Sequence, residues 1–137
     1  MRKLDQRGTA ALEFAMVAVP LFTLMFVIFD LGRYAVTVQS LRMLANAEAR
    51  TLMVQCYGPA EILKTSPSAC GGVDYLSTTQ KQAAAPFLYV GALTPTMRIA
   101  ASANTLTITA SQPGFAMLMP IWGTTLNAPS ASTSIPF

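Results

Sequence analysis

The sequence contains no histidine, only two cysteines and few charged residues, which make up 11% of the chain. Without histidine, Ser-His-Asp and Cys-His catalytic arrangements are excluded, and two cysteines alone make a poor zinc site. The glycines form no phosphate-binding loop, and the dispersed acids show no metal-ligand spacing. A Ser–Lys pair stays open, but nothing in the sequence positions Lys64 or Lys81, and solvated surface lysines are the simpler interpretation. We therefore expect no catalytic residue, no metal and no cofactor.

A basic patch is also missing, although the net charge is +3. Arg2, Lys3 and Arg7 lie at the start of the chain, and the other basic residues are scattered. Surfaces that bind nucleic acids gather Lys and Arg, often with aromatic residues between them. We therefore expect no nucleic-acid partner.

What the sequence does have is one long apolar run, from Thr9 to Phe29, in which Glu13 is the only charged residue. At about 1.5 Å per residue this run makes a helix of roughly 32 Å, close to the ~30 Å hydrocarbon thickness of a bilayer. It predicts a transmembrane helix over 9–29, after a short basic leader over 1–8. An unpaired carboxylate at Glu13 costs a few kcal/mol in such a helix, so its role is the main functional question.

The basic residues of the leader predict the orientation of this helix. Positive charge stays on the cytoplasmic side, so the chain after Phe29 lies outside the inner membrane, in the periplasm. Cys56 and Cys70 both fall on that oxidising side, which favours a disulfide between them. Closing a loop of about 15 residues contributes roughly 3 kcal/mol in the chain-entropy model. Two unrelated free thiols are the alternative.

After the apolar run the helix is expected to continue as an amphipathic segment over 30–55. Apolar residues recur there at spacings of three and four, and no proline interrupts them. Asp30 and Arg33 are spaced to pair where the helix leaves the membrane, as an interface anchor. Pro20 is expected to bend the helix, and Gly58-Pro59 to end it.

Residues 56–137 predict a small disulfide-stapled α+β domain. The expected elements are a short helix over 60–64, a helix over 74–85, strands over 97–102 and 105–111 that form a hairpin, and an edge strand over 128–135. An apolar connection over 112–123 is expected to cover the sheet or to contact a partner. The predicted fold class is thus α+β, with a long N-terminal helix packed on a small antiparallel sheet.

The N-terminal motif resembles a known type of signal. A basic leader, Gly8, four residues, Glu13 and then an apolar helix is similar to a prepilin-type (class III) signal. The longer run through Pro20, Asp30-Leu-Gly32-Arg33 and Ala47-Glu-Ala-Arg50 resembles the TadE-like family of tight-adherence (Tad/Flp) type IVb pilus systems. The close resemblance covers residues 7–55, and the related TadF-like type stays an alternative.

The resemblance implies a pilin-like fold and a minor pilin, or pseudopilin, rather than an enzyme. A prepilin peptidase would cut between Gly8 and Thr9, and the mature subunit would enter or prime a pilus with other pilins as partners. The Glu13 carboxylate would then pair with the new α-amine of Thr9 on a neighbouring subunit. Pairing within one subunit is also open, because the two residues are four apart, and so is extension of Glu13 to the lipid headgroups.

A second function from a different class is an uncleaved, signal-anchored envelope protein whose outer domain binds a ligand or partner. The mature N-terminus separates the two functions, because only the pilin hypothesis requires Thr9 as the first residue.

Overall fold

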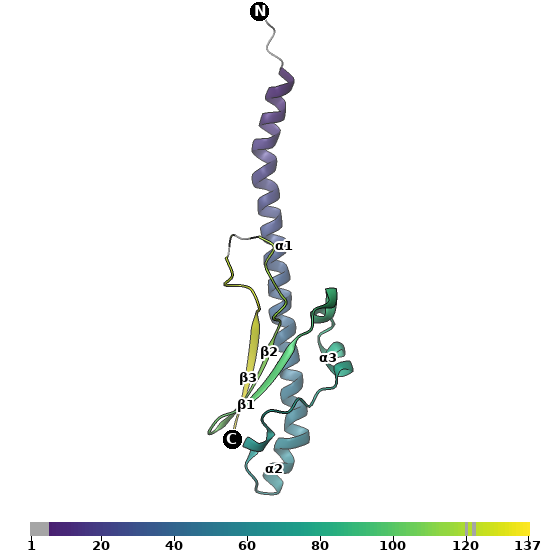
Figure 1. Cartoon of the computed structure of the whole chain (residues 1–137), viewed down its shortest axis with the longest axis vertical. Coiled ribbons are helices and arrows are strands. Elements are labelled where there is room, and N and C mark those ends of the chain that lie inside the picture. The colour runs from purple at the N-terminus through teal and green to yellow at the C-terminus, as the bar shows by residue number, and fades with distance from the viewer. Residues whose placement is uncertain (1–5, 120, 122) are drawn as a thin grey trace, which may run out of the picture.

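The computed structural model describes residues 6–119, 121 and 123–137. One long helix, α1 (Gln6–Leu52), forms the axis of the molecule, and a three-stranded antiparallel sheet packs along its C-terminal half (Figure 1). The predicted α+β architecture is therefore confirmed. The predicted leader lies outside the described residues over 1–5, as do Pro120 and Trp122 of the apolar connection.

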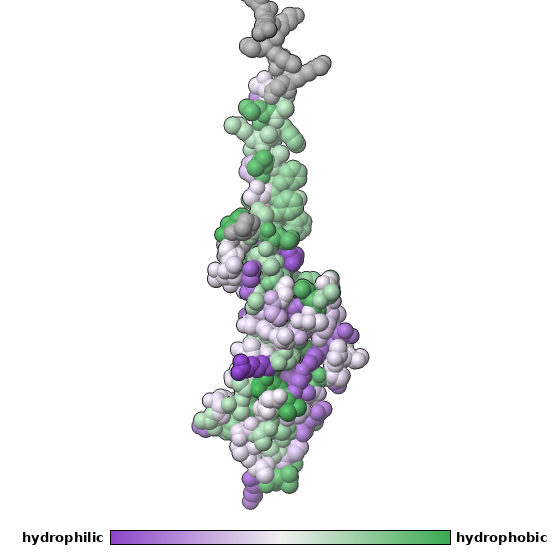
Figure 2. Space-filling view, viewed as in Figure 1, coloured by the Kyte–Doolittle hydropathy of each residue, from purple (hydrophilic) through white to green (hydrophobic). Residues whose placement is uncertain are grey.

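The two halves of α1 differ in what surrounds them. The N-terminal half extends bare from the domain and its surface is largely apolar, whereas the domain below it is mixed (Figure 2). The C-terminal half buries a stripe of side chains at helical spacing: Asp30, Thr37, Leu41, Leu44, Ala45, Glu48 and Leu52. The helix passes through Pro20 without a break.

The expected end of the helix at Gly58-Pro59 is wrong. A single π-helical turn, Met53–Tyr57, follows α1, and the chain continues directly into α2 (Gly58–Ile62). The Gly58 N–H donates to the Met53 carbonyl, five residues back, which is the wider π spacing. Pro59 then stands at the start of α2, where a missing N–H costs least, so proline does not stop the chain here.

The segment between α2 and the sheet, residues 63–95, is largely irregular. It contains a short 3-10 helix at Pro67–Cys70, the helix α3 (Thr78–Ala84) and a second 3-10 segment at Pro86–Ala92. The predicted helix over 74–85 begins four residues late because Ser77 is its N-cap. The Ser77 hydroxyl accepts from the Gln80 N–H, and the Gln80 side chain accepts from the Ser77 N–H. Pro86 comes immediately after the C-cap of α3, Ala85, and so stands at the expected end of the helix.

The sheet has the order β1 (Thr96–Ala101), β2 (Thr105–Ser111) and β3 (Ser130–Pro136), with both neighbours antiparallel. The alternation in β2 buries Leu106, Ile108 and Ala110 against the buried stripe of α1. Both the hairpin and the edge strand are present, the latter starting two residues later than expected. Between β2 and β3 the chain leaves the sheet and runs back along α1 (Figure 1).

Candidate functional site

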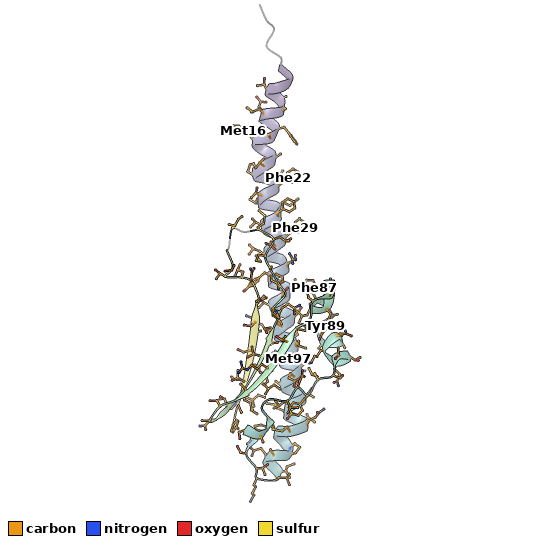
Figure 3. All side chains as sticks on the ribbon, in the orientation of Figure 1. Met16, Phe22, Phe29, Phe87, Tyr89 and Met97 are labelled. Carbon is orange, nitrogen blue, oxygen red and sulfur yellow. A yellow bond between two sulfur atoms is a disulfide. The ribbon has the colours of Figure 1, made fainter. Side chains whose placement is uncertain are left out.

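The bare half of α1, residues 9–29, is the first part of the candidate site. Among the described helices it is the one long and apolar enough to cross a membrane, and none of its most apolar window is buried within the chain. Its large side chains, such as Met16, Phe22 and Phe29, radiate into open space (Figure 3). Apolar surface of this extent needs lipid or other helices to cover it.

The residues of the predicted cleavage and assembly motif lie near the start of this bare half. The described part of α1 begins at Gln6, so the Gly8–Thr9 bond lies close to its start. Thr9 and Glu13 are both exposed. Among the side chains that the structure describes, Glu13 has no ion-pair partner. The structure thus leaves the Glu13 carboxylate on an otherwise apolar helix surface.

Asp30 marks the other end of the bare half and is almost fully buried, with 1% of its side chain exposed. Its Oδ1 atom lies 3.4 Å from Arg33 Nη1, so the two residues pair as their spacing suggested. Its Oδ2 atom makes shorter bonds and accepts the backbone N–H groups of Leu118 at 2.9 Å and Met119 at 3.0 Å. Asp30 therefore holds a distant loop on the helix, a role that the i,i+3 spacing did not reveal.

Arg33 and Phe115 complete this contact. The guanidinium carbon of Arg33 lies 5.2 Å from the centroid of the Phe115 ring, within cation–π range. The Tyr34 ring packs against the same phenylalanine, at 6.3 Å between centroids. We call Asp30, Arg33 and Phe115 the exit cluster, because it lies where α1 leaves its bare half. One acid, one base and one aromatic ring from two parts of the chain thus meet there.

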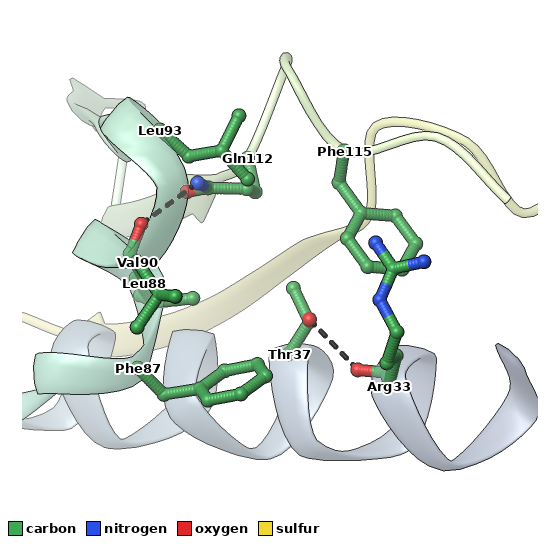
Figure 4. A pocket seen from close by; sticks show the side chains of 8 residues that line it. All are labelled: Arg33, Thr37, Phe87, Leu88, Val90, Leu93, Gln112 and Phe115. Atoms are coloured by element: carbon green, nitrogen blue, oxygen red, sulfur yellow. Dashed lines mark hydrogen bonds between the residues drawn. The ribbon is translucent and has the colours of Figure 1, made fainter. Parts of the chain in front are cut away.

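A small pocket adjoins the exit cluster (Figure 4). Its volume is about 100 Å³, and its lining is mainly apolar, with Arg33, Thr37 and Gln112 as polar members. Gln112 Nε2 donates to the Leu88 carbonyl at 2.9 Å, and no described group donates to Gln112 Oε1. Sites for small-molecule ligands usually measure about 300–1,000 Å³, so this pocket is too small to be a substrate site.

Glu48 is a second buried acid on α1. The sequence placed it among the dispersed acids and in the Ala47-Glu-Ala-Arg50 part of the resemblance, and assigned it no contact. Its Oε1 accepts the Tyr75 N–H at 2.8 Å, and its Oε2 accepts the Leu76 N–H at 3.1 Å. Burial is the main cause that raises the pKa of the Glu48 carboxyl above its ordinary value of 4.5, and the nearby charge of Asp74 acts in the same direction. The signal was present in the sequence, because Glu48 continues the apolar spacing of Leu44 and Leu52.

The cysteines form the expected disulfide, so the free-thiol alternative is excluded. The Cys56–Cys70 bond has a Cα–Cα distance of 5.9 Å and joins the π-helical turn after α1 to the 3-10 helix at Pro67–Cys70. Just after it, the Gly72 N–H donates to the Ile99 carbonyl of β1 at 2.9 Å. The bridge therefore ties the far end of the helix to the sheet edge.

Among the described residues, no three His, Cys, Asp or Glu side chains group as a metal site. The expectations of no catalytic centre and no cofactor stay predictions.

Residues 8–50 of the chain match the model of the TadE-like protein family. No curated protein and no solved structure matches the chain. The matched stretch coincides with most of α1 and includes Gly8, Glu13, Asp30 and Glu48. The sheet, and the segment that joins α1 to it, lie outside the matched residues. Over residues 8–50 the chain is therefore similar to the TadE-like family, as the sequence resemblance predicted.

Proposed function

We propose that this protein is a minor pilin of a tight-adherence pilus, anchored in the inner membrane with its N-terminus cytoplasmic and its domain periplasmic. A prepilin peptidase cuts between Gly8 and Thr9, and the bare half of α1 then packs against the helices of other pilins during pilus assembly. The role is structural and requires no catalytic residue.

The observation that carries this proposal is an apolar half-helix that the chain itself leaves uncovered and that bears one exposed carboxylate, Glu13. A membrane anchor alone has no use for that carboxylate, because an unpaired charge in hydrocarbon is costly. An assembly helix does have a use for it, since the α-amine of a neighbouring Thr9 neutralises it. The TadE-like match over this same segment supports the choice.

The first test is the mature N-terminus, read by mass spectrometry from cells that contain the matching peptidase. We expect Thr9 as the first residue. Retention of Met1 would instead favour the alternative, an uncleaved envelope protein anchored by the same helix.

The second test is Glu13→Ala, with Thr23→Ala as the matched control. Thr23 is also exposed on the bare half, and its hydroxyl bonds only within the helix, to the Val19 carbonyl. Removing Glu13 leaves a neighbour's buried amine unpaired, at a cost of several kcal/mol. We expect Glu13→Ala to stay in the membrane and fail to enter pili or crosslink to other pilins, while the control assembles normally. Normal assembly of Glu13→Ala would reject the pairing role.

A further inference from the structure

The loop over 113–128 runs from the end of β2 back toward the bare half of α1 before the chain returns as β3 (Figure 1). Its base continues the strand pairing, because the Gln112 N–H donates to the Pro129 carbonyl at 3.0 Å and the Ala128 N–H to the Phe115 carbonyl at 3.0 Å. Farther along, the Met117 N–H donates to Asn127 Oδ1 at 2.9 Å. These bonds join the two described ends of the loop, residues 112–117 and 127–129, to each other.

The exit cluster fixes how far along α1 this loop reaches. Asp30 Oδ2 holds the N–H groups of Leu118 and Met119, so these residues lie beside the last turn of the bare half. Side chains of a helix lean toward its N-terminus, so the carboxylate holds the loop on the side of Asp30 that faces the bare half. Figure 3 accordingly shows Phe29 at the level of the loop.

The side chains of this loop are apolar and exposed where it meets the bare half. Leu118 is 76% exposed and Ile121 is 57% exposed, and Phe29 at the end of the bare half is 61% exposed. The chain contains no Asp, Glu, Lys or Arg after Arg98. The apolar surface of the bare half therefore continues onto the loop, with no loop charge to keep it out of an apolar environment.

We propose that Leu118 and Ile121 insert into the interfacial region of the bilayer that α1 spans, as a second contact between the domain and the lipid. The occupant of this surface is the lipid itself, because the patch is continuous with the bare half and lies at its boundary. A single helix leaves a domain free to rotate and tilt over the membrane. Two contacts, with the exit cluster between them, hold the sheet in one orientation to the bilayer. The inference rests on the membrane anchoring that is part of the proposed function.

The test places one nitroxide label at a time on the full-length protein in phosphatidylcholine vesicles. The described cysteines are both in the disulfide, so an introduced thiol is the reactive one. Leu118→Cys reports on the loop, Val19→Cys on the bare half, and Ser132→Cys on an exposed position of β3. Spin-label collision with oxygen, which concentrates in lipid, is compared with collision with a water-soluble nickel chelate.

We expect the oxygen-to-nickel collision ratio at Leu118→Cys to be several-fold above that at Ser132→Cys and below that at Val19→Cys. If the ratio at Leu118→Cys equals that at Ser132→Cys, the inference is overturned. A high ratio at Val19→Cys in the same experiment would still support the membrane anchor. Protection from both reagents at Leu118→Cys would also overturn it, since it indicates a protein contact. An aqueous ratio at Val19→Cys would reject both the anchor and the inference.

Discussion

Replacing Asp30 with alanine removes the acceptor of two backbone amides, those of Leu118 and Met119. A hydrogen bond to a charged group contributes about 1.5–3 kcal/mol, and water reaching the opened loop offsets part of the loss. We therefore expect the free energy of opening the loop to be about 2–4 kcal/mol lower in Asp30→Ala than in the unmodified protein. At 1.4 kcal/mol per factor of ten, the two amides should exchange hydrogen roughly 30- to 700-fold faster.

Asp30→Asn is the matched control, because it keeps an oxygen for both amides and loses only the charge that pairs with Arg33. That ion pair is long, at 3.4 Å, and Arg33 is 41% exposed, so its loss should cost only about 0–1 kcal/mol. Hydrogen exchange measured by mass spectrometry in lipid nanodiscs reads both variants, with Ile108 in the sheet as the internal reference. Unchanged loop exchange in Asp30→Ala would refute the role of Asp30. Equal acceleration in both variants would show that the charge, rather than the two amide bonds, holds the loop.

Two further predictions concern the far end of the domain. Because the pKa of Glu48 is raised in the folded state, that state binds more protons than the unfolded chain just above pH 4.5, so folding stability should fall as pH rises through this interval. Glu48→Gln should remove that part of the slope in denaturant titrations, and parallel curves for the two proteins would contradict it. Reducing the Cys56–Cys70 bond should lower the free energy of unfolding by roughly 3 kcal/mol, measured by thermal melts with and without reductant. A melt unchanged by reductant would be inconsistent with a stabilising bridge.

The sequence predicted the features that depend on local pattern. The long helix follows from apolar spacing, β2 from strict alternation between Leu106 and Ala110, and the hairpin from the break at Ala103-Asn104. The late start of α3 is a capping effect, since Ser77 and Gln80 form a capping box, a local signal that the prediction of a helix over 74–85 overlooked.

Features that depend on partners distant in the sequence could not be predicted in this way. Asp30 bonds to residues 88 and 89 positions away, and Glu48 to residues 27 and 28 positions away. From the sequence, the Asp30 carboxylate could therefore be assigned only one partner, its neighbour Arg33. The prediction that the helix ends at Gly58-Pro59 was wrong for a related reason. Proline stops a regular helix, but a π-helical turn changes the spacing of the bonds just before it.

Asp30 and Glu48 have the same structural role at the two ends of the domain, which is to hold a loop on α1. Each is a buried acid of α1 that accepts two consecutive backbone amides from a loop. They are 18 residues apart, about five turns of 3.6 residues, so they lie on one line of the helix and roughly 27 Å from each other. The domain is thus attached along a single face of α1.

Glu13 lies off that line. Counting back from Asp30 at about 100° per residue, its direction differs from that of the two buried acids by roughly 100° for an unbent helix. In the proposed assembly, a neighbouring pilin helix that approaches the Glu13 side therefore does not have to displace the loop held by Asp30. One face of α1 holds the chain's own domain, and a different face is left for the proposed charge pairing between subunits.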